Sequence, residues 1–201
     1  MASPGSSTTD IRTERRVRLL DREVAPVWHD RFARMIMRAL PPIKDAFVLE
    51  VYGRTGRTTA QLLERLDGGS KLLSLAHDPA QMSRAKTRMR PEWKKQVYFK
   101  KGDFDEVQNM GDESYDLVTA NLVLSSEVPD WKTGLAELLR VTKPGGHVLV
   151  TMALRGSWSE AEDLFEEVLR NEGMREQVGV LRRVQKIRPR PQLIRRVLEE
   201  L

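Results

Sequence analysis

The residues best suited to chemistry follow a short apolar run near position 50. Glu50 is an acid, and Tyr52, Gly53, Arg54 and Gly56 come within the next six positions. Glycine adopts the reversed backbone torsions that tight turns need, and a glycine-rich turn lets backbone N–H groups approach a bound ligand. The spacing therefore predicts a binding turn after a strand, with an aromatic ring and a guanidinium placed among its glycines.

Three more candidate binding residues follow later apolar runs. Asp78 precedes Pro79, where an aspartate either contacts a ligand or, more commonly, caps a helix. Asp103 either faces a ligand or accepts hydrogen bonds from N–H groups of its own loop. Asn121 ends another apolar run. No residue can be named as a general base, so the catalytic residues stay unknown.

Composition excludes several classes of chemistry. The chain has no cysteine, which rules out disulfides, thiolate metal sites and thiol nucleophiles. His29, His77 and His147 are too scattered to form a metal site in their place, and none is predicted. The apolar runs are far shorter than the roughly 20 residues of a membrane span, and the first residues lack a hydrophobic signal core. We therefore expect no membrane insertion and a cytoplasmic location.

The net charge of +5 is unevenly distributed. Between Arg182 and Arg196 every charged residue is basic, and an acidic stretch comes shortly before. Such blocks on neighbouring helices usually pair or stay solvated, which is the first interpretation. The second is a nucleic-acid or acidic-partner site that contacts phosphates alone, because the segment lacks aromatic residues for base stacking. The acids are Glu160, Glu162, Asp163, Glu166 and Glu167.

Short apolar runs alternate with amphipathic segments through the middle of the chain. This alternation is typical of βα units around a parallel sheet, so the predicted fold class is α/β. Lys143-Pro144-Gly145-Gly146 is expected to form a turn that launches the last strand. The predicted strands are 46–51, 71–76, 96–100, 115–121 and 147–154, and the helices between them are 58–66, 79–89 and 131–141.

The two ends of the chain differ from the middle. Residues 1–10 are small and polar and are predicted to be a disordered leader. Residues 11–42 carry apolar residues at helical spacing, with a break at Pro26. Residues 156–201 are predicted to be three helices, 157–171, 174–184 and 192–201. At 201 residues the chain suits one domain, 11–201, around a core over 45–155.

The stretch 48–57 resembles the first motif of class I S-adenosylmethionine-dependent methyltransferases, of the type 11-like kind. Residues 101–104, 113–118 and 137–146 resemble later motifs of the same family, so the resemblance spans about 45–155. It implies a Rossmann-like doubly wound sheet, mainly parallel, of strand order 3-2-1-4-5, with ligands at the carboxyl ends of the strands. It also implies S-adenosylmethionine as cofactor and no metal.

The sequence departs from that resemblance at the cofactor positions. Tyr52 and Arg54 stand where the family has its first two glycines, and Ala76 stands at the place of the acid that binds the ribose. Asp78 lies two residues after that place. Asp103 matches the acid near the adenine, and Asn121 lies where many members hold groups that face the substrate.

Two functions follow from these departures. The first is a non-catalytic pseudo-methyltransferase with an eroded cofactor site, which acts as a macromolecular interaction module through a protein partner or self-association. The second is an active methyltransferase of unknown substrate, in which Arg54 pairs with the cofactor carboxylate and Asp78 reaches the ribose. The family usually adds two late strands, for which this sequence has no candidates. Either the sequence is truncated, or residues 157–201 or a second chain cover the open sheet edge.

Overall fold

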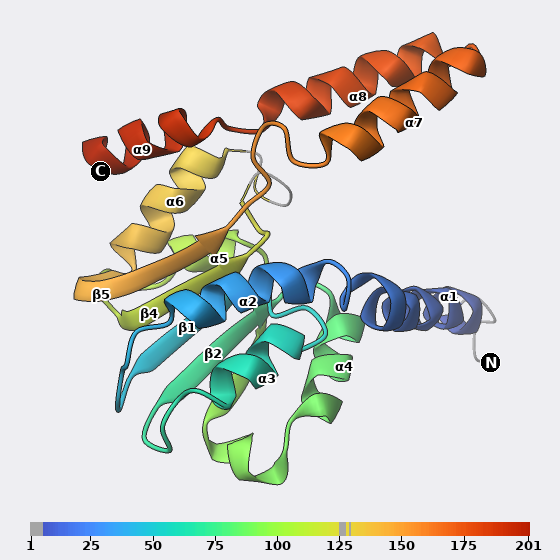
Figure 1. The fold of residues 1–201 in the computed structure, drawn as a ribbon. Coiled ribbons are helices and arrows are strands. Elements are labelled where there is room, and N and C mark those ends of the chain that lie inside the picture. The colour runs from blue at the N-terminus through green and yellow to red at the C-terminus, as the bar shows by residue number, and fades with distance from the viewer. Residues whose placement is uncertain (1–5, 125–127, 129) are drawn as a thin grey trace.

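The computed structural model describes residues 6–124, 128 and 130–201 (Figure 1). Its centre is a parallel five-stranded sheet of order β3-β2-β1-β4-β5, which confirms the expected Rossmann-like order. Helices cover both faces (Figure 1). Within the described residues no strand follows β5. The strands are β1 (Phe47–Val51), β2 (Lys71–Ala76), β3 (Val97–Lys101), β4 (Tyr115–Asn121) and β5 (Thr142–Thr151).

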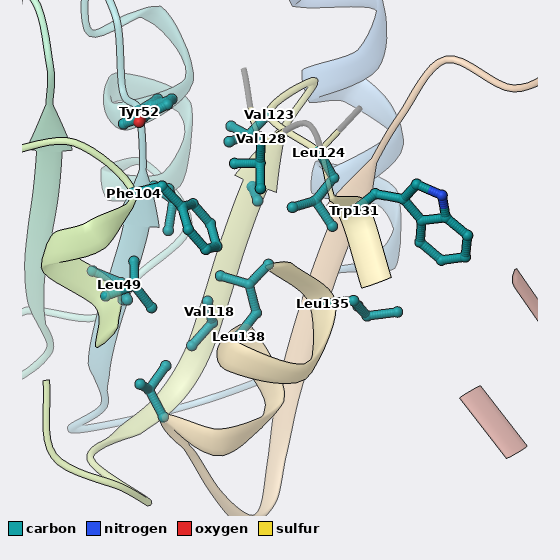
Figure 2. Packing of buried hydrophobic residues seen from close by; sticks show 14 of the residues in the cluster. Leu49, Tyr52, Phe104, Val118, Val123, Leu124, Val128, Trp131, Leu135 and Leu138 are labelled. Carbon is teal, nitrogen blue, oxygen red and sulfur yellow. The ribbon is translucent and has the colours of Figure 1, made fainter. Parts of the chain in front are cut away.

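Side chains of successive strand residues pack against opposite faces of the sheet. Leu49 belongs to a cluster with Leu138 of the helix α6 (Trp131–Arg140), which Figure 2 shows. Val48 belongs to a second cluster with Ile36 of α2 (His29–Ala39) and Leu62 of α3 (Arg57–Leu63). Strands buried on both faces need continuous apolar runs, which is why the sequence revealed them.

Helices connect the strands, and two of them have aspartate caps. Asp78 accepts hydrogen bonds from the backbone N–H groups of Ala80 and Gln81 at the start of α4. Asp130 accepts hydrogen bonds from the backbone N–H groups of Lys132 and Thr133 at the start of α6. A cap of this kind satisfies N–H groups that have no partner inside the helix. The connecting helices are α3 (Arg57–Leu63), α4 (Pro79–Arg88), the 3-10 helix η2 (Pro91–Lys95), α5 (Asp105–Gln108) and α6 (Trp131–Arg140).

The start of β5 differs from the prediction. The segment 143–146 was expected to be a turn before a strand at 147, but β5 already begins at Thr142, which pairs with Tyr115. The next pair is Leu117 with His147, so the register shifts and the extra residues form a bulge. Gly145, at a φ of 77°, supplies the left-handed torsion.

The N-terminal residues form helices, of which α2 lies along one face of the sheet and α1 extends beyond it, next to α4 (Figure 1). They are α1 (Ser6–Leu19), the π-helix η1 (Leu20–Val24) and α2 (His29–Ala39). The predicted break at Pro26 falls in the turn between η1 and α2. The predicted disordered leader, 1–10, overlaps α1 from Ser6 onward, and its first five residues lie outside the described part of the chain.

The C-terminal residues are helical, as expected. The helices α7 (Ser159–Asn171) and α8 (Arg175–Ile187) form a hairpin that projects from the sheet, and α9 (Pro191–Glu200) returns beside α6 (Figure 1). Glu166 pairs with Arg182 at 2.8 Å, and Glu162 pairs with Arg188 at 2.6 Å. These pairs join the acidic and basic blocks, as the paired-face interpretation predicts. Over the described residues, none of the helices has the length and apolar character to cross a membrane.

Candidate functional site

The turn after β1 has left-handed backbone torsions at three residues, two of which carry large side chains. Tyr52, Arg54 and Gly56 have φ values of 58°, 49° and 79°. For residues other than glycine, this left-handed region costs about 1–2 kcal/mol. Tyr52 and Arg54, which the sequence analysis singled out, therefore both have torsions that glycine adopts at lower cost.

Gly53 is held in the turn by close contacts with neighbouring side chains. Its own φ is not in the left-handed region, but a Cβ there would lie 2.2 Å from Ser74 Oγ and 2.6 Å from Glu50 Oε2. Any side chain would therefore displace the buried groups behind the turn. Gly53 is required by close packing and not by torsion.

Glu50 lies behind the turn and is fully buried. Its Oε2 accepts hydrogen bonds from Thr59 Oγ1 at 2.5 Å and from Ser74 Oγ at 2.8 Å. Its Oε1 has no hydrogen-bond partner among the described residues. Burial raises the pKa of Glu50, against these two hydrogen bonds and the charge of Arg54. The acid thus connects the end of β1 to α3 and β2 behind the turn.

Arg54 reaches from the turn to the end of the neighbouring strand. Its Nη1 donates to the carbonyl oxygen of Asn121 at 2.7 Å, and its Nη2 donates to that of Leu122 at 3.1 Å. Leu122 has a φ of 57°, so the carbonyls come from a second left-handed bend. Two adjacent strand ends, β1 and β4, are tied together by one guanidinium.

The side chain of Asn121 is committed to the scaffold. Its Nδ2 donates to the carbonyl oxygen of His29 and to Thr58 Oγ1, and its Oδ1 accepts from Thr151 Oγ1 at 2.7 Å. The residue is buried, with 5% of its surface exposed. The structure therefore places the Asn121 side chain in a hydrogen-bond network between α2, α3 and β5.

The end of β2 brings Tyr52 against His77. Their ring centroids lie 4.9 Å apart, and Tyr52 is buried at the top of the cluster in Figure 2. Ala76, the last residue of β2, adds only a methyl group beside them. The ring pair therefore lies at the carboxyl ends of the first two strands, where both rings line a cavity.

Asp78 is engaged as a helix cap. Its Oδ1 accepts from the backbone N–H groups of Ala80 and Gln81, and its Oδ2 accepts from Gln81 Nε2 and from Arg16 Nη2 at 3.0 Å. Burial raises the pKa of Asp78, but these hydrogen bonds outweigh it and the pKa lies below its usual value. Of the two interpretations of Asp78, the cap is the one that the geometry displays.

Two cavities open at this edge of the sheet. One, of about 610 Å³, is lined by Tyr52, His77, Asp103 and Phe104 together with the start of α6, so Asp103 does face a cavity. The other, of about 560 Å³, also contacts His77 but lies on the side of Arg54 and the terminal helices. A third void, beneath Tyr52, Gly53 and Arg54, measures only about 10 Å³.

A buried charge cluster at this edge was missed by the sequence analysis. Asp21 of η1 accepts hydrogen bonds from Thr55 Oγ1, Arg84 Nε and Arg88 Nη2 at 2.9, 2.9 and 2.7 Å. Burial raises the pKa of Asp21, but the bonds from Arg84 and Thr55 and the charge of Arg88 outweigh it and lower the pKa. An acid among apolar helix positions was the available signal. The cluster fixes the N-terminal helices over the turn.

His29 was noted only as one of three scattered histidines. Burial, assisted by the charge of Arg54, lowers the pKa of His29 to about 4. Its imidazole is therefore neutral at pH 7 and lines the cavity of about 560 Å³. Among the described residues, no group of three or more acids and histidines is arranged to hold a metal ion.

The sheet order and the carboxyl-edge site define a Rossmann-like fold of the class I methyltransferase type. Residues 49–150, just over half of the chain, match the family described as methyltransferase domain. The chain belongs to the methyltransferase domain family.

Individual proteins agree with that placement. A demethylmenaquinone methyltransferase from Beutenbergia cavernae is 30% identical over 147 residues, which are 73% of this chain and 57% of that protein. The chain spans about half the length of the curated relatives it matches.

Two solved structures share the fold at low identity. A SAM-dependent methyltransferase from Aquifex aeolicus has a TM-score of 0.57 at 16% identity, covering 71% of this chain and 73% of that one. A complex of the Haloferax volcanii Trm112 methyltransferase activator with a methyltransferase has a TM-score of 0.56 at 21% identity, covering 70% and 57%. At such identities the likeness concerns the fold alone.

Proposed function

We propose that this domain is a non-catalytic member of its family, in which the turn after β1 supports the fold and does not hold S-adenosylmethionine. One observation carries the proposal. The guanidinium of Arg54 occupies the carbonyl oxygens of Asn121 and Leu122, at the junction of β1 and β4 where the fold places its ligand. A cofactor ammonium or backbone contact there would have to displace two charge-assisted hydrogen bonds.

Other contacts that the resemblance implies for the cofactor are missing, although Asp103 still lines the cavity of about 610 Å³. The void beneath the turn is about 10 Å³, too small for the amino-acid end of a cofactor. The acid for the ribose is replaced by Ala76, and the oxygens of Asp78 are used by the cap and by Arg16. Tyr52 and His77 are in tilted ring contact at the ends of both strands. These residues do not fit S-adenosylmethionine.

Calorimetric titration with S-adenosylmethionine and S-adenosylhomocysteine tests the proposal. We expect no binding of either at millimolar concentration. A triple variant, Tyr52→Gly, Arg54→Gly and Ala76→Asp, serves as the positive control and is expected to gain measurable affinity. Micromolar affinity of the unaltered protein for either compound would overturn the proposal.

An active methyltransferase is the second candidate. Tyr52, Arg54 and Gly56 have left-handed torsions, and Glu50 Oε1 has no hydrogen-bond partner among the described residues. In this candidate Arg54 leaves its carbonyls and pairs with the cofactor carboxylate, and Asp78 leaves its cap to reach the ribose. Arg54→Ala must then lower cofactor affinity. Unchanged affinity in that variant contradicts this mechanism.

A non-catalytic domain that acts as an interaction module needs a binding partner, and the exposed apolar side chains of α7 support a protein partner. The hairpin of α7 and α8 projects from the sheet, and Leu164, Phe165 and Val168 of α7 are about half or more exposed. The Haloferax volcanii neighbour was solved with a protein activator. Sedimentation at increasing concentration separates a monomer from self-association.

Nucleic acid is the weaker partner. Arg182 and Arg188 of the basic segment are occupied by Glu166 and Glu162. Binding through the remaining basic residues would be lost steeply as salt rises, because it releases counterions. A flat salt dependence contradicts phosphate binding.

A further inference from the structure

The helix α7 exposes an apolar stripe to solvent. α7 and α8 pack on each other, and the buried apolar residues of the two helices are Leu169 and Val178. Leu164, Phe165 and Val168 lie on another side of α7, with 64%, 53% and 48% of their surfaces exposed. Their spacing places them on one face of the helix, which we call the α7 stripe. Contiguous exposed apolar surface of this kind commonly marks an interaction site.

Acidic side chains border the α7 stripe. The helix has five carboxylates and one arginine. Glu162 and Glu166 pair within the hairpin, with partners on or next to α8. Glu160 and Glu167 are exposed and have no ion pair with any described residue. They lie four residues before and three residues after Leu164, so both are its neighbours on the helix surface. The α7 stripe therefore has two carboxylates available at its edge.

A groove of complementary character runs along α1 and η1. Its volume is about 410 Å³, and we call it the α1 groove. Val17 is buried on the core side of α1, whereas Arg12 and Arg15 are exposed and have no ion pair with any described residue. The groove thus combines an apolar surface with a basic edge. It is lined by Leu19, Leu20 and Val24 and by Arg12, Arg15 and Arg16.

We propose that the α1 groove of one copy binds the α7 stripe of a second copy, in a reciprocal contact that forms a twofold dimer. The apolar residues of the stripe cover those of the groove, and Glu160 and Glu167 face Arg12 and Arg15. Within one chain α1 and α7 lie apart, so each is accessible to another copy (Figure 1). The inference names the partner of the proposed interaction module and rests on that proposed function.

Charge favours this pairing over the other symmetric ones. A twofold contact requires that one chain carry both a surface and its complement, as the acidic α7 and the basic groove do. A contact of α7 with α7, or of groove with groove, would bring like charges together, which disfavours association. A helix of 13 residues is about 20 Å long, so two such contacts form an interface near the lower end of specific ones. We expect a dissociation constant of about 1–100 µM.

Sedimentation velocity over a concentration series tests for the dimer. The unaltered protein should pass from monomer to dimer across the expected range of concentrations. A protein that stays monomeric up to about 1 mM overturns the inference, whether the groove then takes α7 of its own chain or a different partner. The measurement contains no S-adenosylmethionine. Failure of the dimer is therefore distinct from failure of the proposed function, which the cofactor titration decides.

Charge reversal locates the contact. Glu160→Arg with Glu167→Arg makes the stripe basic, and Arg12→Glu with Arg15→Glu makes the groove acidic. Each double variant alone should dimerise at least about tenfold more weakly, because like charges then meet at both contacts. An equal mixture of the two should restore the dimer, because opposite charges meet at both contacts of the mixed pair. A mixture that stays monomeric contradicts the proposed pairing of α7 with the groove.

The matched control is Glu92→Arg with Glu200→Arg, which makes the same change of net charge at exposed carboxylates of η2 and α9. It should leave the dimer unchanged. A loss of the dimer equal to that of the stripe variant would mean that net charge alone decides association, and it would overturn the inference. Thermal unfolding of each variant at the same concentration verifies that the compared proteins are folded.

Discussion

At the scale of single residues, the turn after β1 combines backbone strain with contacts that offset it. Tyr52 and Arg54 occupy left-handed torsions that glycine adopts freely. At Arg54, two hydrogen bonds to carbonyl oxygens at the end of β4 offset the cost of the left-handed torsion. At Tyr52, the contact with the His77 ring offsets it. The turn is therefore stable with side chains that would ordinarily disfavour it.

Glu50→Gln is expected to stabilise the protein, increasingly so as the pH rises. Burial raises the pKa of Glu50, so the folded state binds its proton more tightly than the unfolded state does. This group's contribution to stability is therefore lost as the pH rises from the unfolded pKa to the raised one, at about 1.4 kcal/mol for each pH unit between them. Gln keeps the shape and carries no charge. Urea unfolding from pH 5 to pH 8 measures the difference.

The comparison variant for Glu50→Gln is Glu92→Gln in the exposed helix η2, which should show no such trend. Parallel stability curves for Glu50→Gln and the unaltered protein across this pH range would show that Glu50 is ionised throughout.

Sequence reasoning identified the altered turn at Tyr52 and Arg54 but not their contacts. The reason is distance along the chain, because the carbonyls that Arg54 binds belong to residues 67 and 68 positions later. Asn121 shows the same limit. Its position at the end of β4 was predictable, but the direction of its amide depends on His29 and Thr151, from other elements.

At the scale of secondary-structure elements, one buried acid fixes the N-terminal helices to the core. Asp21 of η1 contacts α4 through Arg84 and Arg88, and the turn through Thr55. Asp30 of α2 adds a pair with Arg57 of α3. Burial of an acid is stable here because each oxygen has cationic partners.

Asp21→Asn is expected to destabilise the fold by about 2 kcal/mol at pH 7. The loss from breaking a buried pair is about 3–5 kcal/mol, reduced here because Arg84 is half exposed. The pKa of Asp21 is lowered in the fold, so its contribution is present above the unfolded pKa and is lost as pH falls through the folded pKa. Urea unfolding should therefore show a difference in the free energy of unfolding between Asp21→Asn and the unaltered protein that becomes smaller below about pH 4.

Asp163→Asn on the exposed side of α7 is the control for Asp21→Asn and should change stability by less than about 0.5 kcal/mol. If Asp21→Asn were as stable as the unaltered protein at pH 7, the cluster would contribute nothing to the position of the N-terminal helices.

Most elements were predictable because hydrophobic spacing reports burial directly. The strand β2 has the predicted bounds, and α4 and α6 end one residue before the predicted ends. The predicted start of β5 was wrong. Pro144-Gly145-Gly146 has the composition of a turn, but the residues on either side of it pair with β4. A bulge and a turn use the same residues, and only the partner strand distinguishes them.

At the scale of the whole molecule, the C-terminal helices connect back to the core through α9. Val197 is buried in the same cluster as Leu135 and Leu138 of α6. Within the described residues β5 pairs with β4 alone, so α9 and α6 shield the sheet near its last strand (Figure 1). Of the coverings expected for that edge, a return of residues 157–201 toward the core is present in part.

Val197→Ala is expected to lower the free energy of unfolding by about 1.5 kcal/mol, because it removes two buried carbon groups. Leu198→Ala, at the neighbouring and half-exposed position, should change it by less than about 0.5 kcal/mol. Urea unfolding compares the two. Equal effects would mean that α9 is not docked through Val197.

The contact of Trp28 with Trp158 also has an optical consequence. The two indoles lie 4.3 Å apart between centroids at an angle of 44°, and one precedes the sheet while the other follows it. Transition dipoles that are close and not parallel couple, and the coupling gives paired dichroism bands of opposite sign, strongest in the intense far-ultraviolet transition of indole. The contact between the segment before the sheet and the segment after it can thus be followed by circular dichroism without a label, with a variant that lacks one of the two indoles as the reference.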